Sequence, residues 1–100
     1  MNWIDLDNIN MLNRIEADSM SGRVAIFKHS TRCGISRMVL KNFKSEAKAL
    51  GMDINIYLLD LLSHRNISNA IAERWKVKHE SPQLIVLQNG EVIHHASHHG

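Results

Sequence analysis

The sequence has 100 residues, which is enough for one compact domain and too few for two, so residues 1–100 are expected to form a single domain. Hydrophobic residues make up 44% of the chain and charged residues 22%, a composition that excludes disordered and low-complexity proteins. The formal charge at pH 7 is only +2, the basic residues are spread along the chain, and no long apolar stretch occurs. We therefore expect neither a nucleic acid nor a membrane as a partner.

The first half of the chain predicts a helix, a strand and a second helix. A helical stripe of apolar residues behind Asp5 predicts a first helix that ends near Ser21-Gly22. The continuous apolar run Val24–Phe27 predicts a buried central strand. A second stripe predicts another helix, which Gly51 ends. The two stripes consist of Leu6, Ile9, Leu12 and Ile15, and of Val39, Leu40, Phe43, Ala47 and Leu50.

The next segment predicts a second strand and a third helix. Apolar residues alternate at Ile54, Ile56 and Leu58, as in a strand. A helical stripe follows, and Ser63 or Asn66 is the candidate cap of its helix. The stripe consists of Ile67, Ala70, Ile71 and Trp75.

The last segment predicts a hairpin. Two short apolar runs, Leu84–Leu87 and Val92-Ile93, flank Asn89-Gly90, which suits the positive φ values of a tight turn. The predicted order is therefore α-β-α-β-α-β-β, in which a right-handed crossover makes the first two strands parallel. This is the order of an α/β thioredoxin-like fold, with a central four-stranded mixed sheet flanked by helices. Because the sequence stops at Gly100, the closing C-terminal helix of that fold is expected to be missing or truncated.

Cys33, the only cysteine, follows the predicted central strand at the start of a helix. Unpaired backbone N–H groups and the helix dipole favour a thiolate there, and Lys28, Arg32 and Arg37 are close in sequence. The alternative is a buried, inert cysteine, but polar or small flanks favour exposure. These flanks are Thr31, Arg32, Gly34 and Ser36.

Ser36 lies where a dithiol oxidoreductase has its resolving cysteine. A hydroxyl cannot resolve a mixed disulfide, so the mechanism must be monothiol. Ser36 either hydrogen-bonds the thiolate or caps the first helical turn. A lone cysteine fits a reducing compartment, and the chain start does not resemble a signal peptide, so we expect a cytoplasmic protein.

Pro82, the only proline, precedes the third predicted strand. If that strand runs antiparallel beside Val24–Phe27, Ser81-Pro82 faces Cys33 and the two segments form one cleft. A cis peptide bond before Pro82 would turn the Ser81 backbone outward to pair with a substrate peptide, whereas a trans bond is the commoner state of loop prolines.

Three stretches, Phe27–Ser36, Ile67–Glu73 and Val77–Gln83, resemble the monothiol bacilliredoxins, and His95–His98 extends the resemblance. The resemblance implies a thioredoxin-like fold, a cis Pro82, and Cys33 as the nucleophile that takes bacillithiol from protein mixed disulfides. The expected partners are S-thiolated client proteins and bacillithiol or a similar small thiol, which acts as co-substrate and regenerates Cys33. No tightly bound cofactor is expected.

The predicted site residues follow from this resemblance. Cys33, Ser36 and Pro82 are the predicted catalytic residues. Because bacillithiol carries carboxylates, basic side chains near the cysteine are candidates to hold it. The predicted substrate-binding residues are Thr31, Arg32, Gly34, Ile35, Ser81 and Lys28.

Two alternatives remain open. Family members usually have proline where Gly34 stands, so Cys33–Ser36 also resembles the Cys-Gly-Phe-Ser loop of monothiol glutaredoxins, which carry an iron–sulfur cluster. The segment after Asn89-Gly90 lacks the glycine pair and aspartate with which those proteins hold glutathione. The other alternative is a non-catalytic or metal-binding adaptor, based on the histidines at 94, 95, 98 and 99.

His79 is a further candidate, as a proton donor or acceptor for a leaving thiol. Its alternative role is that of a loop residue bonded to backbone.

Overall fold

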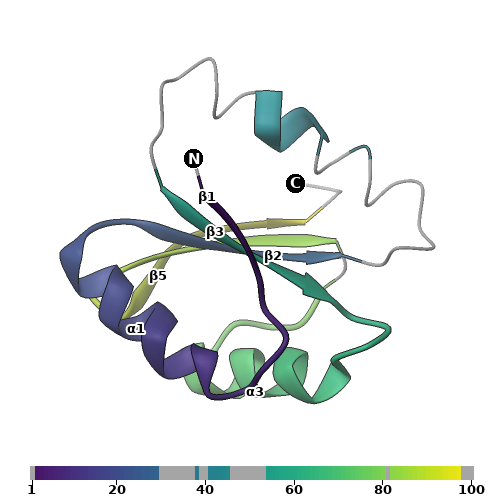
Figure 1. The fold of residues 1–100 in the computed structure, drawn as a ribbon, viewed down its shortest axis with the longest axis horizontal. Helices are drawn as coiled ribbons and strands as arrows, with labels where there is room; N and C mark the ends of the chain where they lie inside the picture. Colours follow the sequence, from purple (N-terminus) through teal and green to yellow (C-terminus); the bar gives the residue numbers. More distant parts are fainter. Residues whose placement is uncertain (1, 30–37, 39–40, 46–53, 81, 98–100) are drawn as a thin grey trace.

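The computed structural model describes residues 2–29, 38, 41–45, 54–80 and 82–97, and every structural statement below concerns this part of the chain. These residues form one five-stranded sheet with helices on both faces (Figure 1). The elements are β1 (Asn2–Asp5), α1 (Met11–Ser21), β2 (Val24–His29), β3 (Asn55–Asp60), α3 (Arg65–Trp75), β4 (Gln83–Gln88) and β5 (Glu91–Ser97).

The sheet is mixed and has the strand order β1-β3-β2-β4-β5. Strands β1 and β2 both run parallel to β3, whereas β4 is antiparallel to β2 and β5 is antiparallel to β4. The predicted α/β class, the parallel pairing of β2 with β3, and the C-terminal hairpin are therefore confirmed.

The sheet has five strands where the sequence predicted four, because β1 was missed. Trp3 and Ile4 of β1 pair with Ile56 and Tyr57 of β3 at the edge of the sheet. Two adjacent apolar residues are too few to show the alternation of a strand. The first helix was predicted to begin behind Asp5, but it begins at Met11 with Asn10 as its N-cap residue.

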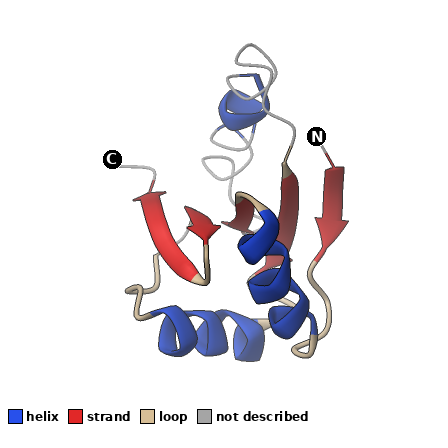
Figure 2. Cartoon of the chain, turned by 90° about the vertical axis from the view of Figure 1, so that its left-hand side faces the viewer, coloured by secondary structure: helices blue, strands red, loops and turns tan. Residues whose placement is uncertain are grey.

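Two hydrophobic clusters cover the two faces of the sheet. Because side chains alternate along a strand, Val24 and Ile26 of β2 face α1 and α3, whereas Ala25 and Phe27 face the other layer. Phe43, in the helical residues 41–45, packs against that second cluster. Figures 1 and 2 show these layers, with α1 and α3 on one side of the sheet and residues 41–45 on the other.

The hairpin turn has the predicted geometry. Asn89 and Gly90 have φ values of 55° and 76°, which are positive as a tight hairpin turn requires. The turn is also tied to the end of α1. The backbone N–H of Asn89 donates to the carbonyl oxygen of Ser19 at 2.7 Å, and that of Gly90 donates to Oγ of Ser19 at 2.9 Å.

The start of α3 differs from the prediction. Neither Ser63 nor Asn66 caps this helix, because its N-cap residue is His64, which makes no side-chain capping bond. Ser63 instead donates from Oγ to Oδ2 of Asp60 at 3.2 Å, and so stabilises the turn that follows β3.

Several predictions concern residues that the structure does not describe. They are the remainder of the second helix, with its predicted end at Gly51, and the state of the chain after Ser97, where a truncated closing helix was expected. Among the described residues, no helix is long and apolar enough to cross a membrane.

Candidate functional site

The segment that carries Cys33 leaves the sheet at the C-terminal end of β2. Pro82 lies at the same end of the sheet, directly before β4. Lys28 of β2 is paired with Gln83, the first residue of β4, so Pro82 lies beside the last residues of β2. Pro82 is itself buried. This confirms the antiparallel arrangement on which the predicted cleft depends. The cleft and the cis bond remain predictions, because Ser81 and Cys33 lie outside the described residues.

Lys28 and Pro82 are the only predicted site residues that the structure describes. The others, like Cys33 and Ser81, lie outside the described part of the chain. Their roles rest on the sequence. They are Thr31, Arg32, Gly34, Ile35 and Ser36, together with Arg37 as a further candidate cation.

Lys28 occupies a position that the sequence did not predict. Its side chain is 0% exposed and lies on the face of the sheet that packs against α1 and α3. Burial disfavours the ammonium form and lowers the pKa of Lys28 from 10.5 to about 8. Lys28 was predicted to hold the carboxylates of a dissolved substrate, but this side chain is not on the surface. Arg32 and Arg37 remain the predicted residues for this role, and both lie outside the described residues.

The ammonium of Lys28 meets a histidine. Nζ of Lys28 lies 3.4 Å from Nδ1 of His79, and Oγ of Ser68, a buried residue of α3, lies 3.0 Å from the same nitrogen. An ammonium can only donate, so Nδ1 accepts from Lys28 and the ring proton lies on Nε2. The neutral imidazole therefore joins β2 to α3. Among the described residues, His79 has side-chain partners and no backbone partner, whereas its alternative role required a bond to backbone.

The loop that carries His79 is held in place by Gln83. This residue is 1% exposed, and its Nε2 donates to the carbonyl oxygen of Lys78 at 2.9 Å. Its Oε1 accepts from the backbone N–H of Glu80 at 3.4 Å. The two bonds flank His79, so Gln83 fixes the position of the imidazole relative to β2. We refer to Lys28, Ser68, His79 and Gln83 as the polar cluster.

The surroundings of His79 favour its neutral form. The residue is exposed overall, but partial desolvation lowers its pKa below the ordinary 6.5, and the charges of Lys28 and Arg65 lower it further. Glu80 has the opposite effect, which is smaller. A neutral His79 is thus compatible with a charged Lys28 at neutral pH.

Sequence reasoning missed Ser68 and Gln83. Ser68 follows Ile67 in the predicted helix, and Gln83 follows Pro82, so each stands beside a residue that was singled out. The helical stripe places Ser68 next to the apolar face, which is the one available signal that it is buried. Nothing in the local pattern indicates that either side chain meets His79 or its loop.

A separate pocket opens at the same end of the sheet. It has a volume of about 350 Å³ and lies where β1, β3 and β2 end. Three carboxylates and two imidazoles line it, and none of its described lining residues is Lys or Arg, so this described part suits a cationic group better than the carboxylates of bacillithiol. The lining residues include Asp5, Asp7, Asp60, His29 and His64.

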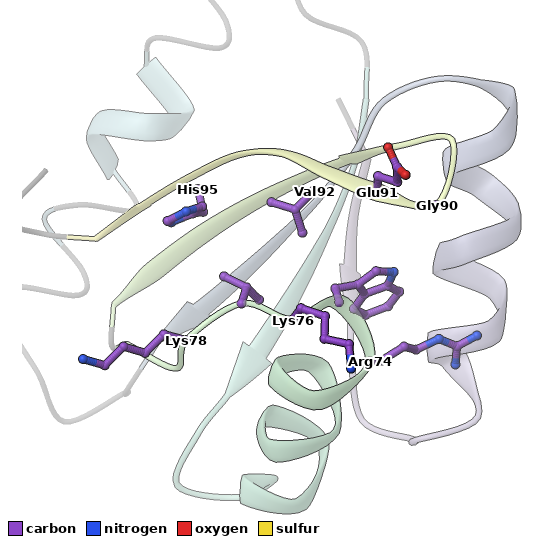
Figure 3. Close-up of a pocket in the computed structure, with 9 residues that line it drawn as sticks. Arg74, Lys76, Lys78, Gly90, Glu91, Val92 and His95 are labelled. Atoms are coloured by element: carbon purple, nitrogen blue, oxygen red, sulfur yellow. The ribbon is translucent and has the colours of Figure 1, made fainter.

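A larger cavity, of about 570 Å³, lies between β5 and the chain that follows α3 (Figure 3). Arg74, Lys76 and Lys78 lie on one side of it, and Glu91 and His95 belong to the β5 side. Neither Lys28 nor Pro82, the two predicted site residues that the structure describes, lines this cavity.

The histidines of β5 lie on opposite faces of the sheet, as predicted. His94 pairs with Val86 and His95 pairs with Ile85, and these two partners belong to different hydrophobic clusters. His98 and His99 are outside the described residues. Within the described ranges, no group of three or more potential ligands is placed to hold a metal ion.

Comparisons with known proteins agree with this architecture. The family model for monothiol bacilliredoxin BrxC matches residues 4–100. A solved structure described, provisionally, as an oxidoreductase with a thioredoxin fold is 32% identical, with a TM-score of 0.82 over 96% of this chain and 82% of that chain.

More distant structures show the fold alone. The thioredoxin of Fasciola hepatica has a TM-score of 0.73 at 13% identity, over 94% of this chain and 85% of its own. A thioredoxin of Schistosoma mansoni has a TM-score of 0.70 at 17% identity, over 97% of this chain and 86% of its own. The chain has the thioredoxin fold of a thiol redox enzyme, and it belongs to the monothiol bacilliredoxin family.

Proposed function

We propose that this protein removes bacillithiol from protein mixed disulfides by thiol–disulfide exchange at Cys33. The observation that carries the proposal is the family match over residues 4–100, which includes the one cysteine of the chain and the serine at position 36. A chain with a single thiol can exchange but cannot close an internal disulfide, which is the chemistry of a monothiol enzyme.

The proposed reaction has two exchange steps. In the first, the Cys33 thiolate attacks the bacillithiol sulfur of the mixed disulfide, and the bond to the client sulfur breaks. The client leaves as a thiolate that takes a proton from water, and bacillithiol is now bonded to Cys33. In the second step, the thiolate of another bacillithiol attacks this adduct and leaves as bacillithiol disulfide, so that Cys33 is a thiolate again. Such exchange requires a reducing compartment, and we place the protein in the cytoplasm.

The proposal is tested by intact-mass spectrometry of the reduced protein after incubation with a bacillithiol mixed disulfide. The expected product carries one bacillithiol on Cys33, loses it when free bacillithiol is added, and does not form with Cys33→Ser. Absence of this adduct in the wild-type protein would falsify the exchange mechanism.

Ser36→Cys provides a matched gain-of-function variant. A second thiol three residues after Cys33 is placed to attack the adduct from within the chain, as in a Cys-x-x-Cys motif. We expect this variant to release bacillithiol without added thiol and to become two hydrogens lighter than its reduced form. A stable adduct on Ser36→Cys would contradict the predicted placement of residue 36 in the first helical turn, beside Cys33.

A further inference from the structure

Lys28 is a buried charge without an anionic partner in the described part of the chain. Its side chain is 0% exposed, and the described polar group that it meets is the neutral Nδ1 of His79 at 3.4 Å. The ion pair recorded among the described residues joins Arg74 to Glu16 and does not involve Lys28. Buried charges in proteins are normally paired with an opposite charge, because desolvation otherwise opposes folding. With no anion beside it among the described residues, this ammonium opposes folding, which indicates a use other than stability.

We propose that Lys28 and His79 are positioning residues for the exchange site: His79 holds the Lys28 ammonium at the edge of the sheet where the Cys33 segment begins, and the ammonium favours the thiolate of Cys33. This inference rests on the proposed function, because it assigns the buried charge to the sulfur chemistry of that site. Lys28 acts through the protein interior and does not touch the substrate.

The chain itself limits how far the backbone of Cys33 lies from that of Lys28. Cys33 follows Lys28 by five residues, so the Cα atoms of the two residues are at most about 17 Å apart even in a fully extended chain. At an effective dielectric constant of about 20, an ammonium about 10 Å from a sulfur anion changes the ratio of thiolate to thiol on the order of tenfold. A buried ammonium is also screened less by salt than the exposed basic side chains of the surface.

His79 keeps the ammonium in one position, and this depends on its neutral form. Protonation would place a hydrogen on Nδ1, which could then no longer accept from Lys28 and would face it with a like charge. Arg65 of α3 adds to this repulsion, and Glu80 of the loop opposes it. The strand neighbours of Lys28 are Leu59 of β3 and Gln83 of β4, which carry no charge. At acidic pH, protonation of His79 therefore breaks its contact with Lys28.

The test measures the pKa of Cys33 from the pH dependence of its alkylation rate, in the full chain and in four variants. Lys28→Met removes the charge but keeps an unbranched side chain. His79→Leu removes the acceptor, whereas His79→Asn keeps an acceptor near the position of Nδ1 that does not titrate. Lys78→Met is the matched control, because it removes an exposed charge of the same loop.

We expect Lys28→Met and His79→Leu to raise the pKa of Cys33 by about 0.5 to 1 and to slow exchange near neutral pH roughly three- to tenfold. We expect His79→Asn to keep the low pKa of Cys33 and to retain more of its rate than the wild type on acidification. Lys78→Met is expected to change neither quantity.

The outcome separates this inference from the proposed function. If wild-type Cys33 titrates no lower than a free thiol, the proposed function fails. If wild-type Cys33 has a lowered pKa that Lys28→Met leaves unchanged in a folded protein, as judged by circular dichroism, the inference fails and the proposed function stands. Equal effects of Lys28→Met and Lys78→Met would also overturn it, because they would show only a dependence on net charge.

Discussion

Lys28 of β2 lies directly opposite Gln83 of β4, so the strand that leads to Cys33 is paired with the strand that follows Pro82. The Cys33 segment and the Pro82 segment, which are far apart in the sequence, therefore lie at the same end of the sheet. The proposed exchange depends on both. The Gln83 side chain extends this link to the loop that carries His79. The pairing of β2 with β4 and the polar cluster thus hold together the segments that flank the proposed site.

Gln83→Leu is expected to weaken this link. Leucine fills a similar volume but leaves the carbonyl of Lys78 and the N–H of Glu80 without their partner, which costs about 1–3 kcal/mol of unfolding free energy. The His79 loop also loses its fixed position, so we expect slower exchange at Cys33. Chemical denaturation and exchange kinetics measure the two effects. Gln88→Leu, at the other end of β4, is the control. Equal losses of exchange rate in both variants would contradict a role for the polar cluster.

The burial of Lys28 makes the stability of the protein depend on pH. Because the pKa is about 8 in the folded state and 10.5 ordinarily, the unfolded chain binds more protons between these values. The free energy of unfolding therefore gains a contribution as pH rises through this range. Below pH 8 the buried ammonium costs the fold roughly 3 kcal/mol.

Lys28→Met removes this cost, and we expect the variant to be more stable than the wild type at pH 7. The difference in unfolding free energy should shrink by about 2 kcal/mol between pH 7 and pH 9.5. Urea denaturation at several pH values measures it. A variant that is less stable than the wild type, with a difference independent of pH, would show that Lys28 contributes mainly to stability.

Tyr57 is expected to contribute to stability and not to exchange. Its hydroxyl donates to Oδ2 of Asp18 at 2.6 Å, and burial together with this carboxylate raises the pKa of Tyr57 to about 12. The folded state favours the protonated phenol, so this contribution is complete below pH 10 and is lost as pH rises toward 12.

We expect Tyr57→Phe to lower the free energy of unfolding at pH 7 by about 1–2 kcal/mol. We expect the variant to lack the loss of stability that the wild type shows above pH 10, and to exchange at the wild-type rate. Thermal unfolding and exchange kinetics test both points. An unchanged unfolding free energy would mean that the bond to Asp18 adds nothing to stability.

Arg32 is the first candidate to hold the carboxylates of bacillithiol. Charge reversal in Arg32→Glu is expected to slow exchange with a bacillithiol disulfide roughly tenfold more than exchange with an uncharged disulfide. Arg23→Glu is the control, because Arg23 directly precedes β2 and so lies at the opposite end of that strand from the Cys33 segment. Equal losses with the two disulfides would contradict a binding role for Arg32.

Much of the fold was predictable because its signals are local. The apolar run Val24–Phe27 predicts the central strand, and Asn89-Gly90 predicts the turn whose φ values the structure has. Strand β1 was not predictable in this way, because Trp3-Ile4 has no strand pattern of its own and is a strand through its pairing with β3. The cap of α3 was missed for a similar reason, since Ser63 bonds to Asp60 instead.

The polar cluster was beyond local reasoning. A lysine after a buried apolar run resembles the exposed end of a strand, and its partner His79 stands 51 positions further along the chain. Only the pairing of β4 with β2 and the packing of α3 bring the two together. The cysteine and its neighbours were predicted from chemistry and family resemblance, which do not depend on packing, and their roles stay predictions.

The most direct measurement of the central claim follows both halves of a mixed disulfide. A client protein with bacillithiol on its only cysteine is mixed with the reduced protein, and the products are separated by mass. The account predicts bacillithiol on Cys33 and a client with a free thiol. Transfer of the client sulfur to Cys33 with release of free bacillithiol, or no transfer at all, would contradict it.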